Sequence, residues 1–195
     1  MLSKIQPLQL TMCRYSLVIT TFLCAATAVA EEPTTIRLRV TGLFSPDREA
    51  DLREVMMLIP DAKLVSVDYA NAEAVFEYIP NSAFDKAKPD KIPERLDNAV
   101  RTNSRSTFSV KALCPIPHEK LESIEIGVVG LDCKGCALGA YESVAKIDGV
   151  YQATTSFKDG LVTAKFDPEK TNRAALEAAL VKARVELQKP TAAQP

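Results

Sequence analysis

The stretch "ESIEIGVVGLDCKGCALGAYESVAKIDGV", residues 122–150, contains the pattern that decides the fold. Ile124, Ile126 and Val128 alternate with other residues up to Gly130, which is typical of a half-buried β-strand. The apolar residues after the next loop recur at helical spacing: Ala137, Ala140, Val144 and Ile147. The stretch therefore predicts a strand, a loop with two cysteines and a helix that ends at the turn Asp148-Gly149.

The same pattern occurs 88 residues earlier, in "TTIRLRVTGLFSPDREADLREVMMLIPD", residues 34–61. Both copies follow the glycine at the end of the strand with a leucine. Two further strands are expected at the same offset. They are marked by Val65, Val67 and Tyr69, and by Ala74, Phe76 and Tyr78, in the first copy, and by Ala153, Thr155 and Phe157, and by Val162, Ala164 and Phe166, in the second. A constant offset over three strands and a helix indicates an internal repeat.

Each copy then continues with a second helix and a short strand, "FSVKAL" in the first and "RVELQ" in the second. In the second copy the helix is expected to begin after Thr171 as N-cap. The first copy has about eight extra residues, in "IPNSAFDKAKPD", residues 79–90. The order β-α-β-β-α-β predicts an α+β protein of two tandem ferredoxin-like units, each a four-stranded antiparallel sheet with both helices on one face.

The first 30 residues differ from the rest of the chain. Lys4 and Arg14 are their only charges, an apolar stretch follows, and Ala28-Val29-Ala30 precedes Glu31. This order is typical of a secretory signal peptide with cleavage near Ala30, so we expect a periplasmic or secreted protein. We expect the mature chain to comprise a first domain at 34–113, a linker at 114–122, a second domain at 123–188 and a disordered tail at 189–195. After cleavage, stable membrane insertion is not expected.

Charge and composition exclude several function classes. Without residues 1–30, 22 Lys and Arg remain against 25 Asp and Glu, a net charge of about −3. This balance argues against a nucleic-acid binder, which needs a basic surface. The sequence also contains no Gly-rich phosphate loop, no histidine for a catalytic triad beyond His118 and no carboxylate pair with a specific spacing. We therefore expect a protein that is not an enzyme.

Cys133 and Cys136 lie at the start of the predicted helix in the second copy. A helix N-terminus lowers the pKa of a thiol, so Cys136 and its neighbour are expected to be thiolates near neutral pH, with Lys134 adding a positive charge. Two thiolates three residues apart can hold a soft ion such as Cu(I), or Hg(II), Zn(II) or Cd(II). The same pair can also form an inert disulfide or act as a thiol–disulfide redox couple, and the spacing alone leaves these alternatives open.

Residues 123–188 resemble the heavy-metal-associated domain of copper chaperones, P-type ATPase metal-binding modules and the periplasmic mercury-binding protein. "GLDCKGC" matches the family's metal loop, with Leu131 where the family has methionine. "IDGV", "FDP" at 166–168, Thr171 and the Ala-rich second helix match as well. Arg184-Val185 replaces the family's usual Gly-aromatic pair.

The resemblance implies that Cys133 and Cys136 bind a soft metal ion, Cu(I) first, and pass it on by thiolate ligand exchange. The partner would be a metal-donor or metal-acceptor protein, such as a transport ATPase or an efflux component. The process would serve metal trafficking, buffering or resistance.

The first copy lacks the thiols, because Ser45 and Arg48 stand where Cys133 and Cys136 stand in the second. A hydroxyl and a guanidinium cannot replace two thiolates for a soft metal. Residues 34–113 are thus expected to be a degenerate copy with a structural or partner-binding role. Cys114 and His118, in the linker, are weaker candidates for additional ligands. An interaction module in which both copies only bind a partner is a further alternative.

Overall fold

The computed structural model describes residues 32–188, all of which belong to one compact unit. The signal peptide predicted at 1–30 and the tail predicted at 189–195 lie outside the described residues. Within the described part, no helix combines the length and the apolar character needed to cross a bilayer.

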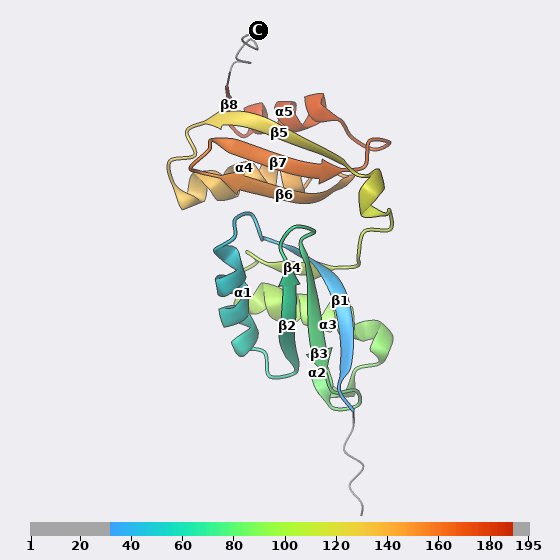
Figure 1. Ribbon diagram of the computed structural model, residues 1–195. Coiled ribbons are helices and arrows are strands. Elements are labelled where there is room, and N and C mark those ends of the chain that lie inside the picture. The colour runs from blue at the N-terminus through green and yellow to red at the C-terminus, as the bar shows by residue number, and fades with distance from the viewer. Residues whose placement is uncertain (1–31, 189–195) are drawn as a thin grey trace, which may run out of the picture. The chain divides into compact units, whose positions relative to one another are not determined.

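The N-terminal copy is a four-stranded antiparallel sheet in the order β2-β3-β1-β4 (Figure 1). Its main elements are β1 (Thr34–Thr41), α1 (Arg48–Met57), β2 (Ala62–Asp68), β3 (Glu73–Tyr78), α3 (Ile92–Asn103) and β4 (Ser109–Lys111). The eight extra residues predicted in this copy lie in a connection that carries α2 (Ala83–Lys86) and the 3-10 turn η1 (Pro89–Lys91).

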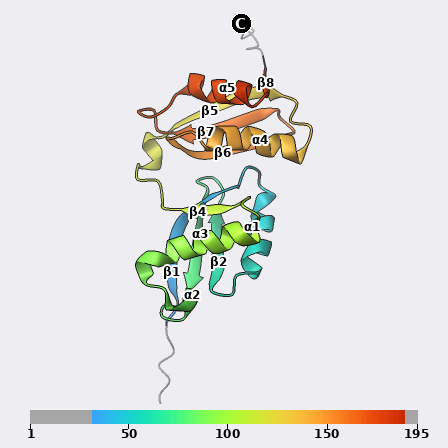
Figure 2. The same cartoon turned by 180° about the vertical axis from the view of Figure 1, so that it is seen from behind.

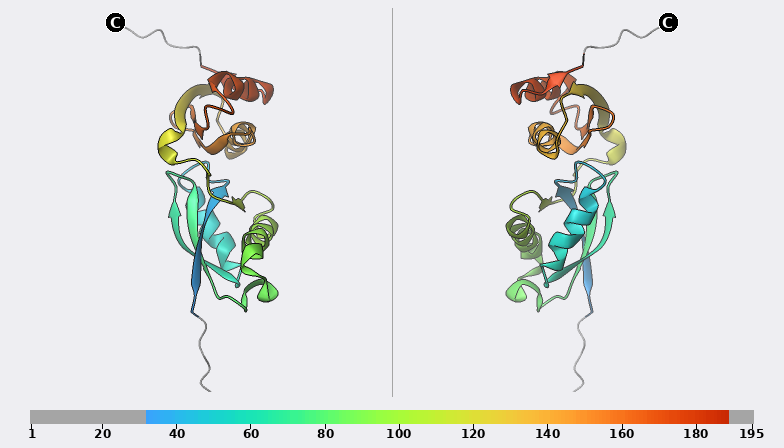
Figure 3. Two further views of the ribbon diagram at one scale, coloured as in Figure 1. Left: turned by 90° about the vertical axis from the view of Figure 1, so that its right-hand side faces the viewer. Right: turned by 90° about the vertical axis from the view of Figure 1, so that its left-hand side faces the viewer.

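The C-terminal copy repeats this topology, with the sheet order β6-β7-β5-β8. A short turn, η2 (His118–Lys120), leads into it. The elements that follow are β5 (Glu122–Val129), α4 (Lys134–Ala145), β6 (Val150–Ser156), β7 (Leu161–Phe166), α5 (Arg173–Lys182) and β8 (Glu186–Leu187). In each copy the two long helices lie on the same face of the sheet, which is clearest when Figures 2 and 3 are compared with Figure 1. The predicted fold of two tandem ferredoxin-like units is confirmed.

Each copy has its own hydrophobic core between sheet and helices. Leu52, Phe76 and Leu96 are fully buried in the first, and Val144 and Leu176 in the second. These side chains lie on the apolar faces that period-two and helical spacing predicted. Phe44 of the first copy packs into the core of the second.

Two local predictions were wrong. Strand β2 was expected to bury Val65, which is 46% exposed, while Ala62 and Leu64 are buried. The pairing register shifts between Leu64 and Ser66, and such a bulge changes which side chains face the core. The N-cap of α5 is Asn172 and not its neighbour Thr171, since the Asn172 side chain accepts the Ala175 N–H at 3.1 Å.

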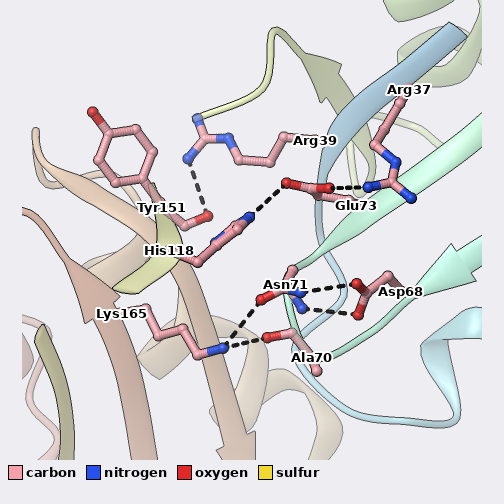
Figure 4. Close-up of polar contacts among 9 residues, drawn as sticks. All are labelled: Arg37, Arg39, Asp68, Ala70, Asn71, Glu73, His118, Tyr151 and Lys165. Carbon is pink, nitrogen blue, oxygen red and sulfur yellow. Dashed lines mark hydrogen bonds and ion pairs between the residues drawn. The ribbon is translucent and has the colours of Figure 1, made fainter. Parts of the chain in front are cut away.

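Strand β6, at the edge of the C-terminal sheet, meets the N-terminal copy through several hydrogen bonds. The Thr155 N–H donates to the Phe44 carbonyl at 2.7 Å, and the Gln152 side chain donates to the Tyr69 carbonyl at 2.8 Å. The Arg39 guanidinium donates to the Val150 carbonyl at 3.2 Å and to the Tyr151 carbonyl at 3.1 Å, and Figure 4 shows the second of these bonds. These bonds cover an edge that would otherwise expose unpaired backbone groups.

Candidate metal centre

Cys133 and Cys136 lie at the exposed N-terminus of α4, in the loop that follows β5. Cys133 is the N-cap residue and has extended backbone angles, φ −143° and ψ 156°. Its Sγ atom accepts the backbone N–H of Cys136 at 3.0 Å. An N-cap side chain usually satisfies this helix donor with an oxygen, and here a sulfur does so. The cap therefore holds the first sulfur next to the backbone of the second cysteine.

The two thiols differ in acidity. The pKa of Cys133 lies below its ordinary value, first because the Cys136 side chain donates a hydrogen bond to its sulfur and second because the Cys136 N–H does. The pKa of Cys136 is raised, because its proton is held by Cys133 and because a second negative charge would sit beside the first. The prediction of a lowered pKa is thus correct for Cys133 and wrong for Cys136. In this hydrogen bond the Cys136 thiol donates and the Cys133 sulfur accepts, so ionisation is favoured at Cys133 and opposed at Cys136.

The equivalent loop of the N-terminal copy has its polar groups tied to one another. The Ser45 hydroxyl donates to Asp47 Oδ1 at 2.5 Å, and this bond is the main reason why the pKa of Asp47 is lowered. Arg48 pairs with Asp51, and its Cζ lies 4.4 Å from the Phe108 ring centroid. These side chains hold the loop together and present no soft ligand.

The N-terminal loop also reaches the C-terminal copy beside the cysteines. Gly42 donates its N–H to the hydroxyl of Tyr141 on α4 at 2.6 Å, in a buried position. The Phe44 ring lies 5.6 Å from the Tyr141 ring, between centroids. Lys134, between the cysteines, has its Nζ 4.0 Å from Asp47 Oδ2. Tyr141 packs in the core of the C-terminal copy and also accepts this hydrogen bond from the N-terminal copy.

The weaker ligand candidates do not join the cysteine pair. His118 Nε2 lies 3.0 Å from Glu73 Oε1, and this carboxylate also pairs with Arg37 Nη1 at 3.5 Å (Figure 4). Cys114 is a partly buried free thiol. Among residues 32–188, no group of three or more His, Cys, Asp and Glu side chains is placed to hold a metal ion.

Sequence reasoning missed the residues that surround Cys133. Phe44, Thr155 and Phe157 line the same groove as Cys133. Phe44 occupies the position of Asp132 in the repeat, and an aromatic residue in an otherwise polar loop was the one available signal. Thr155 and Phe157 were assigned to a strand face, and nothing in their spacing indicated a site.

Comparison with family models gives one match, to the heavy-metal-associated domain, over residues 125–184. Residues 125–184 are a heavy-metal-associated domain. The match includes all of α4 with both cysteines and ends before β8. A comparison of the sequence with curated proteins returned no match.

Solved structures with a similar fold include metal-related proteins. The N-terminal domain of a potential copper-translocating P-type ATPase from Bacillus subtilis, in the Cu(I)-loaded state, is 28% identical, with 35% of this chain and 85% of that chain covered at a TM-score of 0.34. Oxidised MerP from Ralstonia metallidurans CH34 is 22% identical, with 35% and 94% covered at a TM-score of 0.34. The water-soluble region of the P-type ATPase CopA from Bacillus subtilis is 17% identical, with 85% and 99% covered at a TM-score of 0.34.

Proposed function

We propose that this protein binds a soft metal ion between Cys133 and Cys136 and passes it to or from another protein. The observation that carries the proposal is the capped thiol pair of the heavy-metal-associated domain, exposed at the N-terminus of α4, with one sulfur already favoured as thiolate. Soft thiolates select Cu(I) and comparable ions, and a two-sulfur site leaves room for an incoming ligand. Cu(I) is the first candidate, followed by Hg(II), Zn(II) and Cd(II).

Transfer would proceed by ligand exchange and not by catalysis. The thiolate of a partner adds to the bound ion, a three-sulfur intermediate forms, and one cysteine of this protein leaves. A metal-transporting ATPase or an efflux component fits as partner. The N-terminal copy, proposed to be a degenerate relative, supplies a scaffold and no ligand.

We place this activity outside the cytoplasm, on the strength of the signal-peptide pattern at residues 1–30. The intact mass of the protein recovered from the periplasm or medium tests this. A mature chain that begins at Glu31 supports export, and a full-length chain retained in the cell contradicts it.

Metal binding is tested by titrating the reduced protein with Cu(I), Hg(II) and Zn(II) in turn against a competing chelator. Cys133→Ser/Cys136→Ser is the site variant and Cys114→Ser is the matched control. We expect Cu(I) binding that the control retains and the site variant loses. Equal, weak binding by the wild type and the site variant would refute the function.

A second function, thiol–disulfide exchange, is favoured by the unequal acidity of the two thiols. An exposed cysteine with a lowered pKa beside one with a raised pKa is suited to attack a disulfide and then release it. The measured reduction potential of the pair and its rate with a disulfide substrate decide this alternative. A rate no faster than that of a free thiol removes it.

A further inference from the structure

A groove of about 490 Å³ lies beside Cys133 and is lined by both copies. This volume is in the range of small-molecule sites, about 300–1,000 Å³. Cys133 lines the groove and Cys136 does not. Its apolar lining residues are Phe44, Ala137, Leu138 and Phe157. The groove therefore places an apolar surface next to Cys133 and away from Cys136.

One polar group in the groove has no hydrogen-bond partner within residues 32–188. Thr155 lines it, is 5% exposed, and has a buried Oγ1 without a hydrogen-bond partner among the described residues. Its backbone N–H is used by the Phe44 carbonyl, so only the hydroxyl is free. Buried hydroxyls are nearly always paired in proteins, and exceptions call for an explanation. A ligand that fills the groove would supply the missing partner.

The N-terminal copy holds its wall of the groove in place. Phe44 is 7% exposed, its ring lies 5.6 Å from that of Tyr141, and the Arg48 guanidinium carbon lies 5.2 Å from its ring centroid. A wall fixed from several sides costs little to order when a ligand binds. This gives the loop that lacks thiols a part in the site that has them.

We propose that the groove binds soft metal cations that carry an apolar organic group, of which the arylmercury cations are the simplest. The inference rests on the proposed function, because the same thiolate binds the metal. Mercury with one carbon ligand needs one sulfur to complete two-coordination, and Cys133 is the sulfur that lines the groove. The aromatic ring lies against the apolar wall, and a polar substituent reaches the Thr155 hydroxyl.

The reaction is a ligand exchange without any change of oxidation state. The Cys133 thiolate attacks mercury, the new S–Hg bond forms, and the bond from mercury to its previous ligand breaks. A small thiolate leaves with its electron pair, and the carbon–mercury bond stays intact. No oxidant or reductant is required.

The test compares three probes in the full-length chain with Cys13→Ser, Cys24→Ser and Cys114→Ser, so that Cys133 and Cys136 are the remaining thiols. Methylmercury, phenylmercury and para-mercuribenzoate are each supplied as the mercaptoethanol complex, and the exchange constant onto the protein is measured. In the ratio of the exchange constants of two probes, the contribution of the Hg–S bond cancels. We expect phenylmercury to be preferred over methylmercury by about tenfold, because binding transfers its apolar ring from water into the groove.

Variants assign the preference to the groove. Phe157→Ser, at a residue 65% exposed, should lower the phenyl-to-methyl ratio several-fold, while Met57→Ser, 83% exposed on α1, should leave it unchanged. Thr155→Val should weaken para-mercuribenzoate relative to phenylmercury, because only the former offers a carboxylate to the hydroxyl. Equal exchange constants for methyl and phenyl, or a ratio unaffected by Phe157→Ser, would overturn the proposal.

Two single substitutions, one at each cysteine, separate this inference from the proposed function. Cys136→Ser should keep the phenyl preference while it loses tight Cu(I) binding, and Cys133→Ser should lose both. Cu(I) binding without a phenyl preference in the parent chain would refute the groove and leave the function intact. A phenyl preference without Cu(I) binding would refute the proposed function and leave the groove intact.

Discussion

The loops at 42–48 and 130–136 occupy the same place in two copies of one fold, and their polar groups are used in opposite ways. In the first, Ser45 is bonded to Asp47 and Arg48 is packed on two aromatic rings. In the second, Cys133 and Cys136 are exposed, and the Cys133 sulfur accepts the N–H of Cys136. The side chains of the first loop make contacts within the protein, whereas the thiols of the second loop are accessible to a ligand. The fold does not need the thiols, since the copy without them folds with the same strand order.

The glycines that begin the two loops should respond most differently to substitution. Both have positive φ, 98° at Gly42 and 81° at Gly130. A Cβ on Gly42 would lie 2.2 Å from the Thr107 carbonyl oxygen, whereas one on Gly130 meets nothing within 4 Å. Gly42→Ala should lower the free energy of unfolding by about 3–5 kcal/mol and Gly130→Ala by about 1–2 kcal/mol. Urea denaturation measures both, and equal losses would contradict the idea that the first loop is the packed one.

The hydroxyl of Tyr141 joins the two loops, and its removal should cost somewhat less. Tyr141→Phe leaves the buried Gly42 N–H without its acceptor, so we expect a loss of about 1–3 kcal/mol in the free energy of unfolding. Tyr151→Phe is the control, since its ring is only half-buried and Arg39 bonds its carbonyl and not its hydroxyl. Hydrogen exchange at Gly42 should accelerate in the first variant alone. Unchanged exchange would mean that the hydroxyl does not hold the loop.

Arg48 and Cys136 are equivalent positions with different tasks. Arg48→Ala removes a guanidinium from above the Phe108 ring and should destabilise the protein by about 1–2 kcal/mol. Cys136→Ala, at an exposed side chain, should leave thermal stability unchanged while it weakens Cu(I) binding. If Cys136→Ala destabilised the chain as much as Arg48→Ala, the thiol would have a structural role.

The smallest expected effect concerns the acidity of the two thiols. Cys136→Ala should raise the pKa of Cys133, because its sulfur loses the main hydrogen bond that favours the thiolate. Cys133→Ala should lower the pKa of Cys136, because the thiolate that holds its proton is gone. The pH dependence of alkylation of the remaining thiol, in a chain with Cys13→Ser, Cys24→Ser and Cys114→Ser, measures both shifts. Shifts of the same sign would refute the shared-proton description.

The same two groups set the pH dependence of metal binding. A bound ion displaces the Cys136 proton, so affinity for Cu(I) should rise with pH until Cys136 is deprotonated in the free protein. Above that pH the affinity should level off. An affinity that is flat from acid to alkaline pH would show that no thiol proton is displaced.

The fold could be predicted from the sequence because burial repeats with a fixed period. Alternation at β1 and β5 and the constant offset between copies determine the strands, and the loop position of the cysteines follows from them. The bulge in β2 could not be predicted, since it depends on pairing with β3 and not on local spacing. At the candidate site the cysteines could be recognised, but the groove could not. Phe44 joins it through contacts with Thr155 and Tyr141, more than 90 residues away in the chain, and no periodic signal reports such contacts.

The most direct test of the contrast between the two loops is the copper X-ray absorption spectrum of the Cu(I)-loaded chain in which Cys114 is replaced by Ser. A two-coordinate site with sulfur neighbours alone, lost in Cys133→Ser/Cys136→Ser and unchanged in Ser45→Ala, is the result we predict. Oxygen or nitrogen neighbours at copper, or a spectrum that the double variant leaves unchanged, would contradict the assignment of the metal to residues 133 and 136.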